Sequence, residues 1–237
     1  SEIVADWANG RRLAFIGDGD AISVCVAYLK ARGVIDFGPS KITVFDFDER
    51  TVQSIKRFAD KERMEHLDAQ LYNVFDPFPD TTQFDCFYTN PPWGASNKGE
   101  SVNVFVDRGI EAIKGIGDGM IVIADDDERA WPKIVLANVQ RHASQQGFFV
   151  SRMQRKLHEY HLDDDPDLRS CNLFVTAVPD RAPNTQASQP IAADRLSNFY
   201  GMAQAPKVKY VREKKKPDYG KAPDEEYYVE YLEGENP

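Results

Sequence analysis

Four consecutive residues, Asn90, Pro91, Pro92 and Trp93, carry the groups needed to hold an amino nitrogen. An amine can donate hydrogens to the Asn90 side-chain oxygen and the Pro91 backbone oxygen while the Trp93 ring covers its flank. Its lone pair then remains free to attack an electrophile. The prolines fix φ at about −65° and exclude helical geometry for the residue before them, so the loop is rigid before a ligand arrives. The alternative is a tight turn after a strand, without a ligand.

A glycine-containing turn lies upstream. The apolar run 13–16 is followed by Gly17, Asp18, Gly19 and Asp20, and then by apolar residues at helical spacing. A strand, a glycine turn and a helix start form the first unit of a nucleotide-binding α/β sheet. We therefore predict that this turn contacts a nucleoside.

Three further acids follow predicted strands. Asp46 and Asp48 lie at the end of the apolar run 41–46, where a carboxylate suits the two ribose hydroxyls of an adenosine. Asp76 lies in the loop after the run 68–73, from which we expect it to approach the adenine edge. A glycine turn, a ribose acid, an adenine acid and an Asn-Pro-Pro-aromatic loop, in this order, resemble the binding motifs of class I S-adenosylmethionine-dependent transferases.

The glycine turn departs from the ordinary methyltransferase pattern of acid-x-Gly-x-Gly-x-Gly. Phe15 stands at the upstream acid position, and Asp18 and Asp20 flank Gly19. Like charges about 4 Å apart cost about 4 kcal/mol at an effective dielectric near 20, so two acids here disfavour the carboxylate tail of S-adenosylmethionine. They favour decarboxylated S-adenosylmethionine, whose tail is a propylamine. In the alternative interpretation, both acids cap the following helix.

The chain also resembles the branched-chain polyamine synthases, or N4-bis(aminopropyl)spermidine synthases. That family has a Gly-Asp-Asp-Asp loop, an Asp-Ile-Asp-Glu-Arg-like strand end and an Asp-Pro-Pro-Glu loop, which residues 17–20, 46–50 and 90–93 match in order. Gly19 replaces the middle acid, and Asn-Pro-Pro-Trp is closer to the tetrad of adenine-N6 and cytosine-N4 methyltransferases. The family's amino-terminal winged-helix-like domain has no match in these residues, so we expect a short member or an isolated catalytic domain.

Composition favours an amine over a nucleic acid as the partner. The 237 residues include 38 acids and 29 bases, for a net charge of −9, whereas nucleic-acid binding depends on basic contacts to phosphates. An acidic protein attracts a small polycationic amine instead. Asp125 and Asp126 follow the apolar run 119–124, at the sheet edge where ligands bind, and we expect them to hold distal ammonium groups. The acidic run 163–167 is more typical of a solvated loop.

Apolar runs alternate with helical patterns along the first three quarters of the chain, which indicates a mainly parallel sheet. The last two runs are joined by a segment too short for a crossover helix and should pair antiparallel. We predict an α/β fold, a Rossmann-like class I methyltransferase sandwich, over residues 1–180. Its seven-stranded sheet should be mainly parallel, with an antiparallel last strand and helices on both faces. Residues 181–237 are predicted to form a linker, a short helix near 192–203 and a charged, mobile tail. The expected strands are 12–16, 41–46, 68–73, 84–89, 119–124, 147–155 and 171–178, and the expected helices are 21–33, 50–61, 102–115 and 130–144.

The three cysteines have no metal or disulfide spacing, which predicts a reduced, cytoplasmic protein without a metal. No apolar run approaches the roughly 18–20 residues of a membrane span, so no membrane partner is expected. The sequence is compatible with a homodimer.

These features predict aminopropyl transfer from decarboxylated S-adenosylmethionine to a polyamine such as spermidine. The reaction is an in-line displacement in which the enzyme mainly orients the two partners. Asp18 and Asp20 are the candidates for base and electrostatic guide, and Asn90 would orient the nitrogen. An S-adenosylmethionine-dependent N-methyltransferase acting on adenine or another exocyclic amine is the first alternative, with Trp93 stacked on a flipped base. A catalytically idle nucleoside-binding protein is the second.

Overall fold

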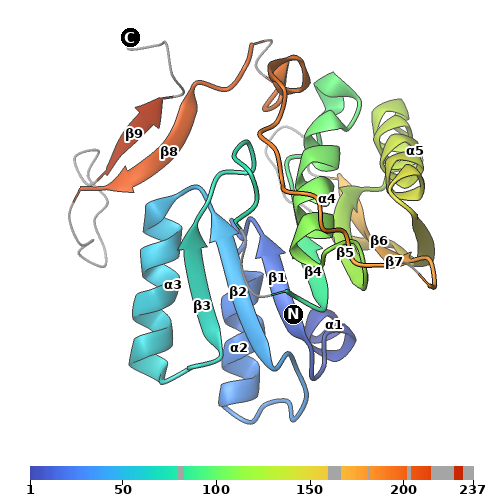
Figure 1. Cartoon of the computed structure of the whole chain (residues 1–237). Coiled ribbons are helices and arrows are strands. Elements are labelled where there is room, and N and C mark those ends of the chain that lie inside the picture. Colours follow the sequence, from blue (N-terminus) through green and yellow to red (C-terminus); the bar gives the residue numbers. More distant parts are fainter. Residues whose placement is uncertain (80–82, 160–166, 181, 202–203, 215–226, 232–237) are drawn as a thin grey trace.

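The computed structural model describes residues 1–79, 83–159, 167–180, 182–201, 204–214 and 227–231. Its main sheet has seven strands in the order β3-β2-β1-β4-β5-β7-β6 (Figure 1). The elements are α1 (Glu2–Trp7), β1 (Arg12–Ile16), α2 (Ile22–Ala31), β2 (Lys41–Asp46), α3 (Glu49–Glu62), β3 (Leu67–Leu71), β4 (Cys86–Thr89), η1 (Ala95–Asn97), α4 (Glu100–Ala112), β5 (Asp118–Ala124), α5 (Ala130–Gln145), β6 (Phe148–Glu159), β7 (Arg169–Ala177), η2 (Ala193–Leu196), β8 (Val208–Glu213) and β9 (Tyr227–Tyr231).

Strands β1 to β5 pair in parallel, and β7 pairs antiparallel with both β5 and β6. This confirms the predicted mainly parallel, seven-stranded sheet with an antiparallel last strand. The predicted pairing follows from chain length, since antiparallel neighbours need only a short connection whereas parallel ones need a crossover.

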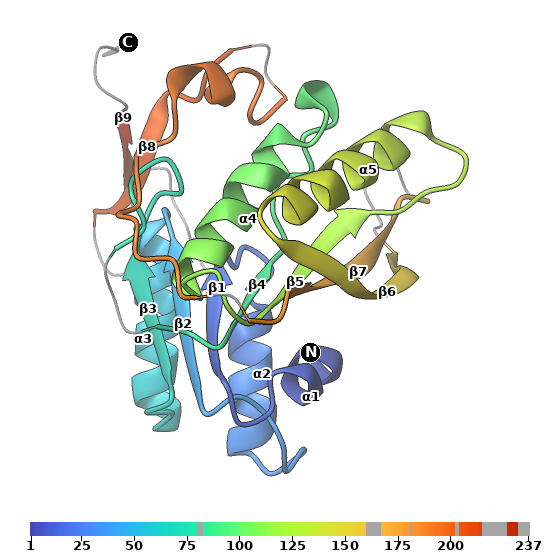
Figure 2. The same cartoon turned by 45° about the vertical axis from the view of Figure 1, so that its right-hand side comes forward.

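Helices cover both faces of the sheet, as Figure 2 shows. The sheet therefore divides the hydrophobic core into two clusters, one on each face. Alternate residues of β1 point to opposite faces, so Ala14 and Ile16 pack with α4 and α5, and Leu13 and Phe15 pack with α1, α2 and α3. A sheet covered on both faces needs strands that are apolar throughout. The observed three layers therefore match the unbroken apolar runs of the sequence.

The segment predicted as a tail differs from that expectation. Residues 193–196 form a single 3₁₀ turn in place of the predicted helix over 192–203, and β8 pairs antiparallel with β9. The prediction lacked these strands because β8 takes part of its pairing from loops of the main sheet: the Val211 backbone N–H donates to the Phe47 carbonyl at 3.2 Å. Residues 215–226 and 163–166 lie outside the described residues. Within the described ranges, none of the helices has both the length and the apolar character to cross a membrane.

Candidate active site

A cavity of about 260 Å³ opens at the carboxyl ends of β1, β2, β3 and β4. This is the sheet edge at which open α/β folds bind ligands. The structure brings six of the predicted site residues together in its wall: Gly17, Gly19, Asp46, Asp48, Asn90 and Pro92.

Gly17 begins the turn after β1 and has φ of 74°, a conformation that favours glycine. Its backbone N–H donates to the Phe45 carbonyl at 2.8 Å, which fixes the turn against the end of β2. A Cβ atom here would lie 3.3 Å from the Phe105 ring. Glycine therefore lets the backbone follow a path that brings it to the cavity wall.

Asp46 connects the glycine turn to the predicted ribose position. Its carboxylate accepts hydrogen bonds from the backbone N–H groups of Asp18, at 3.1 Å, and Asp48, at 2.9 Å. Burial raises the pKa of Asp46, these two hydrogen bonds oppose the rise, and the neighbouring Asp48 charge adds to it. Each carboxylate oxygen has a second lone pair, so Asp46 can still accept hydrogen bonds from two hydroxyls in the cavity.

Asp48 lines the same cavity and also caps α3. Its carboxylate accepts a hydrogen bond from the Arg50 backbone N–H at 2.9 Å, the usual arrangement at the first turn of a helix. The Arg50 guanidinium donates to the same carboxylate at 2.6 Å. Asp48 is therefore held in place chiefly by its own helix.

The two acids of the glycine turn point in different directions. Asp18 is buried, and its carboxylate accepts hydrogen bonds from both the backbone N–H and the hydroxyl of Ser23 in the first turn of α2. Burial raises the pKa of Asp18 to about 8, the nearby Asp20 and Asp46 charges add to the rise, and the Ser23 bonds oppose it. Asp18 thus accepts hydrogen bonds from the first turn of α2, although Ala21 is the residue that directly precedes that helix.

Asp20 instead meets the Asn-Pro-Pro loop. The Asn90 side-chain nitrogen donates to an Asp20 carboxylate oxygen at 3.0 Å, so the amide oxygen of Asn90 keeps its lone pairs. The ends of the two strands are joined directly as well, because the Thr89 hydroxyl donates to the Ile16 carbonyl at 2.8 Å. The Asp20 carboxylate and the Asn90 amide oxygen therefore lie close together where Asn90 lines the cavity.

Trp93 lies beside a second indole rather than in the wall of the cavity. Its Nε1–H donates to the Val122 carbonyl at 3.2 Å, and its ring lies 6.4 Å from the Trp131 ring, tilted by 30°. The predicted contact between Trp93 and an acceptor stays a prediction.

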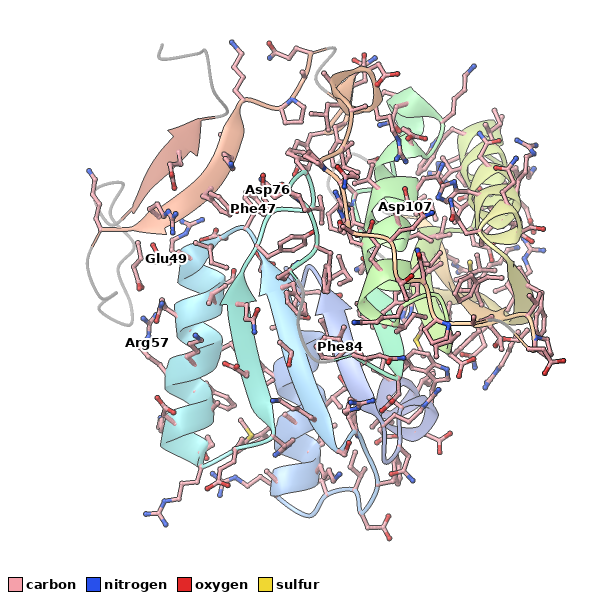
Figure 3. All side chains as sticks on the ribbon, in the orientation of Figure 1. Phe47, Glu49, Arg57, Asp76, Phe84 and Asp107 are labelled. Carbon is pink, nitrogen blue, oxygen red and sulfur yellow. The ribbon has the colours of Figure 1, made fainter. Side chains whose placement is uncertain are left out.

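Asp76 faces the carboxy-terminal strand β8. Figure 3 labels Asp76 in the loop that follows β3. Its carboxylate accepts a hydrogen bond from the Tyr210 hydroxyl at 2.8 Å and pairs with the Lys209 ammonium at 3.3 Å. The residues of this loop that line the cavity are Asn73 and Val74. The predicted approach of Asp76 to the adenine edge stays a prediction, and in this structure its carboxylate is bound by residues of β8.

Asp125 and Asp126 lie in a separate hollow of about 290 Å³ beyond the end of β5. Asp125 accepts hydrogen bonds from the Arg155 guanidinium at 2.7 Å and the Lys156 backbone N–H at 2.9 Å. Asp126 is bonded to the backbone and side chain of Arg129. An ammonium group would compete with these basic partners, so the predicted binding role of the two acids stays a prediction.

Tyr200 also lines the cavity, although the sequence placed it in the segment after the sheet. Its ring lies 5.0 Å from Phe199 and 6.5 Å from Phe75. Loss of solvation around the hydroxyl, with a contribution from the Asp46 charge, raises the pKa of Tyr200 to about 12, so the phenol is neutral. The two adjacent aromatics, in an otherwise polar segment, were the only local signal of this contact.

The strand order, the glycine turn after β1, the acid ending β2 and the Asn-Pro-Pro loop after β4 define the class I methyltransferase-like fold. Solved structures that have this fold are similar to the structure of this chain. One is the C9 mutein of the branched-chain polyamine synthase from Thermus thermophilus, in complex with N4-aminopropylspermidine and 5′-methylthioadenosine; its TM-score is 0.65 at 19% identity, covering 85% of this chain and 60% of that chain. Another is a putative RNA methyltransferase from Pyrococcus horikoshii, with a TM-score of 0.53 at 15% identity, covering 75% of this chain and 80% of that chain.

The family is shown by sequence. The model described as "Branched-chain polyamine synthase A C-terminal domain" matches residues 4–234, and the chain belongs to this family, which confirms the predicted resemblance.

Two curated relatives are named N(4)-bis(aminopropyl)spermidine synthase. That of Thermococcus kodakarensis is 35% identical over 111 residues, which make up 46% of this chain and 28% of the relative. That of Methanocaldococcus jannaschii is 29% identical over 102 residues, 42% of this chain and 26% of the relative. The matched stretch thus spans little more than a quarter of either relative.

Proposed function

We propose that this chain transfers an aminopropyl group from decarboxylated S-adenosylmethionine to a nitrogen of a polyamine such as spermidine. The observation that carries the proposal is the hydrogen bond between Asn90 and Asp20 at the edge of the nucleoside cavity. It joins a carboxylate, which attracts a cationic amine, to an amide oxygen that can orient that amine. Membership in the polyamine synthase family supports the same reaction.

The donor would occupy the cavity. The backbone of Gly17 and Gly19 would approach the nucleoside, Asp46 would accept the ribose hydroxyls, and Asn73 would face the adenine edge. Tyr200 would cover the opposite side of the ligand. The sulfonium and its propylamine tail would then extend toward Asp20, whose charge favours an ammonium over a carboxylate.

The acceptor nitrogen attacks the carbon beside the sulfonium, and the carbon–sulfur bond breaks with its electron pair remaining on sulfur. The products are the aminopropylated amine and methylthioadenosine. An aliphatic amine with a pKa of about 10 is protonated at neutral pH, so it must lose a proton before it attacks. Asp20 is the proposed guide and proton acceptor, while the Asn90 and Pro91 oxygens hold the nitrogen on line.

Asp18 would act differently from our expectation that it shares the catalytic role. Its carboxyl group is bonded to Ser23, and its backbone N–H donates to Asp46. We propose that Asp18 fixes the turn that carries Asp20, without direct contact with the acceptor.

The test is incubation of the protein with spermidine and each donor, carboxylated or decarboxylated, followed by mass analysis of the amine. We expect the amine to gain one aminopropyl group and methylthioadenosine to be released. A methyl gain from S-adenosylmethionine on a nucleobase would establish the methyltransferase alternative. Binding of methylthioadenosine with no turnover of either donor would indicate an idle nucleoside-binding protein.

A further inference from the structure

Arg108 is a buried cation in the middle of α4, with a relative exposure of 1%. Its Nε–H donates to the Val74 carbonyl at 2.9 Å, and its Nη2 donates to the Gln189 carbonyl at 2.8 Å. A charged side chain is seldom fully buried unless it is paired. These bonds therefore identify the groups that the buried Arg108 charge holds in place: the backbone carbonyls of Val74 and Gln189.

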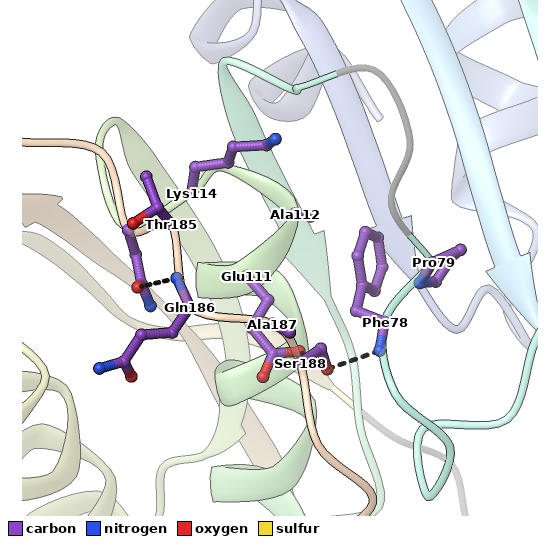
Figure 4. Close-up of a pocket in the computed structure, with 10 residues that line it drawn as sticks. Phe78, Pro79, Glu111, Ala112, Lys114, Thr185, Gln186, Ala187 and Ser188 are labelled. Atoms are coloured by element: carbon purple, nitrogen blue, oxygen red, sulfur yellow. Dashed lines mark hydrogen bonds between the residues drawn. The ribbon is translucent and has the colours of Figure 1, made fainter.

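The third nitrogen of the guanidinium completes a network with the segment that follows the main sheet. Nη1 donates to the Glu111 carboxylate at 2.7 Å and to the Ser188 hydroxyl oxygen at 2.8 Å. The Ser188 hydroxyl donates to Glu111 at 2.8 Å and accepts from the Phe78 backbone N–H at 2.7 Å (Figure 4). The network thus joins α4 to the loop 73–78 at one side and to residues 188–189 at the other.

This network supports a wall of the nucleoside cavity. Val74, whose carbonyl binds Arg108, lines the cavity together with Asn73. Phe105, one turn earlier on α4, lines the cavity too and lies against Gly17. Helix α4 therefore sets the distance between the glycine turn and the loop 73–78, and Arg108 is the side chain that bonds it to that loop.

We propose that Arg108 is a positioning residue for the nucleoside donor. Its guanidinium fixes the Val74 backbone at the cavity wall, and Glu111 and Ser188 fix the guanidinium. The inference rests on the proposed function, because it assigns the same cavity to the nucleoside. It adds a polar network around the buried Arg108, outside the predicted site residues, that determines donor affinity.

The test uses Arg108→Lys, which keeps the charge but has a single donor group for acceptors that lie in different directions. A single ammonium group cannot serve both the Val74 and the Gln189 carbonyl, and loss of the donor to the Val74 carbonyl leaves a buried group unsatisfied, which is costly. Arg195→Lys is the matched control, because Arg195 binds Asp107 of the same helix at 3.0 Å and also pairs with Glu100. This substitution changes an arginine of η2 that is ion-paired to α4, without changing the bond to Val74.

We expect Arg108→Lys to raise both the Kd for methylthioadenosine and the donor KM by about tenfold, the effect of losing one hydrogen bond to a charged group. The acceptor KM should stay within twofold of the wild type, as should all constants of Arg195→Lys. If the role of Arg108 is only structural, both variants should have a lower melting temperature, and their Kd for methylthioadenosine and donor KM should equal those of the wild type. If Arg108→Lys does not fold, Ser188→Ala takes its place, with the donor KM at least doubled and the acceptor KM unchanged.

If a folded Arg108→Lys variant binds methylthioadenosine with unchanged affinity, the positioning role of Arg108 is refuted, while the proposed function still stands. An equal rise in the donor and acceptor KM would overturn the positioning role too, since the network would then act on the whole site. In Ser188→Ala, an unchanged donor KM has the same meaning. If the wild type itself binds no methylthioadenosine, the proposed function fails, and the inference fails with it.

Discussion

Replacing Asn90 by aspartate places a second carboxylate at the position where an amide nitrogen now donates to Asp20 at 3.0 Å. The hydrogen bond becomes a like-charge contact. At about 3 Å, two charges repel by about 1.4 kcal/mol in water and by about 5.5 kcal/mol at an effective dielectric of 20. Because this edge of the cavity is open to solvent, we expect Asn90→Asp to lower the free energy of unfolding by the smaller amount, about 1 to 2 kcal/mol, when no acceptor is bound.

A cationic acceptor reverses the sign of that effect, because its ammonium group lies between two carboxylates. We expect Asn90→Asp to keep or lower the KM for spermidine, and Asn90→Ala to lose activity because it lacks any acceptor oxygen. The measurement is steady-state kinetics at low and high salt, with the advantage of Asn90→Asp shrinking as salt screens the added charge. Asn138→Asp is the control: Asn138 of α5 donates to the Lys98 carbonyl, and its replacement adds the same charge away from the cavity. A spermidine KM that rises in Asn90→Asp, together with reaction of uncharged nucleobases, would refute the amine assignment.

Three further predictions concern the nucleoside and the glycine turn. Asp46→Ala should weaken methylthioadenosine and S-adenosylhomocysteine to the same degree by calorimetry, because the ribose is common to both; loss of only one ligand would show that Asp46 does not bind the ribose. Decarboxylated S-adenosylmethionine or methylthioadenosine should raise the melting temperature more than S-adenosylhomocysteine, whose carboxylate is repelled by the Asp20 charge; the reverse order would favour methyl transfer. The raised pKa of Asp18, about 8 against about 3.9 unfolded, means that the folded state binds more protons between these values, so wild-type stability should fall as pH rises from about 4 to 8. Chemical denaturation of the wild type and Asp18→Asn at pH 5 and pH 8.5 checks this. The free energy of unfolding of Asp18→Asn relative to that of the wild type should be higher at pH 8.5 than at pH 5. A difference in free energy of unfolding that does not change with pH would contradict burial of Asp18 as the cause.

Local sequence determined the frame of the site. The apolar run ending at Ile16, followed by Gly17, has few conformations besides a strand and a turn with positive φ. Asp46 ends the next strand, and parallel strands place their carboxyl ends at one edge. The rigid Asn90 loop follows a third strand at that edge. These contacts were predictable because each depends on the conformation of a few adjacent residues and on a common sheet geometry.

Tertiary structure decided which side chains face the ligand. Asp18 and Asp20 have identical side chains and are separated only by Gly19. Asp18 nevertheless binds Ser23 and Asp20 binds Asn90, because the conformation of the turn sets the direction of each side chain. Asp125 is paired with Arg155, which a different strand supplies.

The carboxy-terminal segment shows the same limit over a longer distance. Tyr200 lines the cavity, and Tyr210 of β8 binds Asp76, so both tyrosines make contacts with residues that are distant in the sequence. The composition around these tyrosines is polar and charged, and it contains no periodic pattern from which their partners follow. Sequence determines conformation where neighbouring residues suffice to fix it, whereas a contact between distant segments depends on the free energy of packing the whole chain.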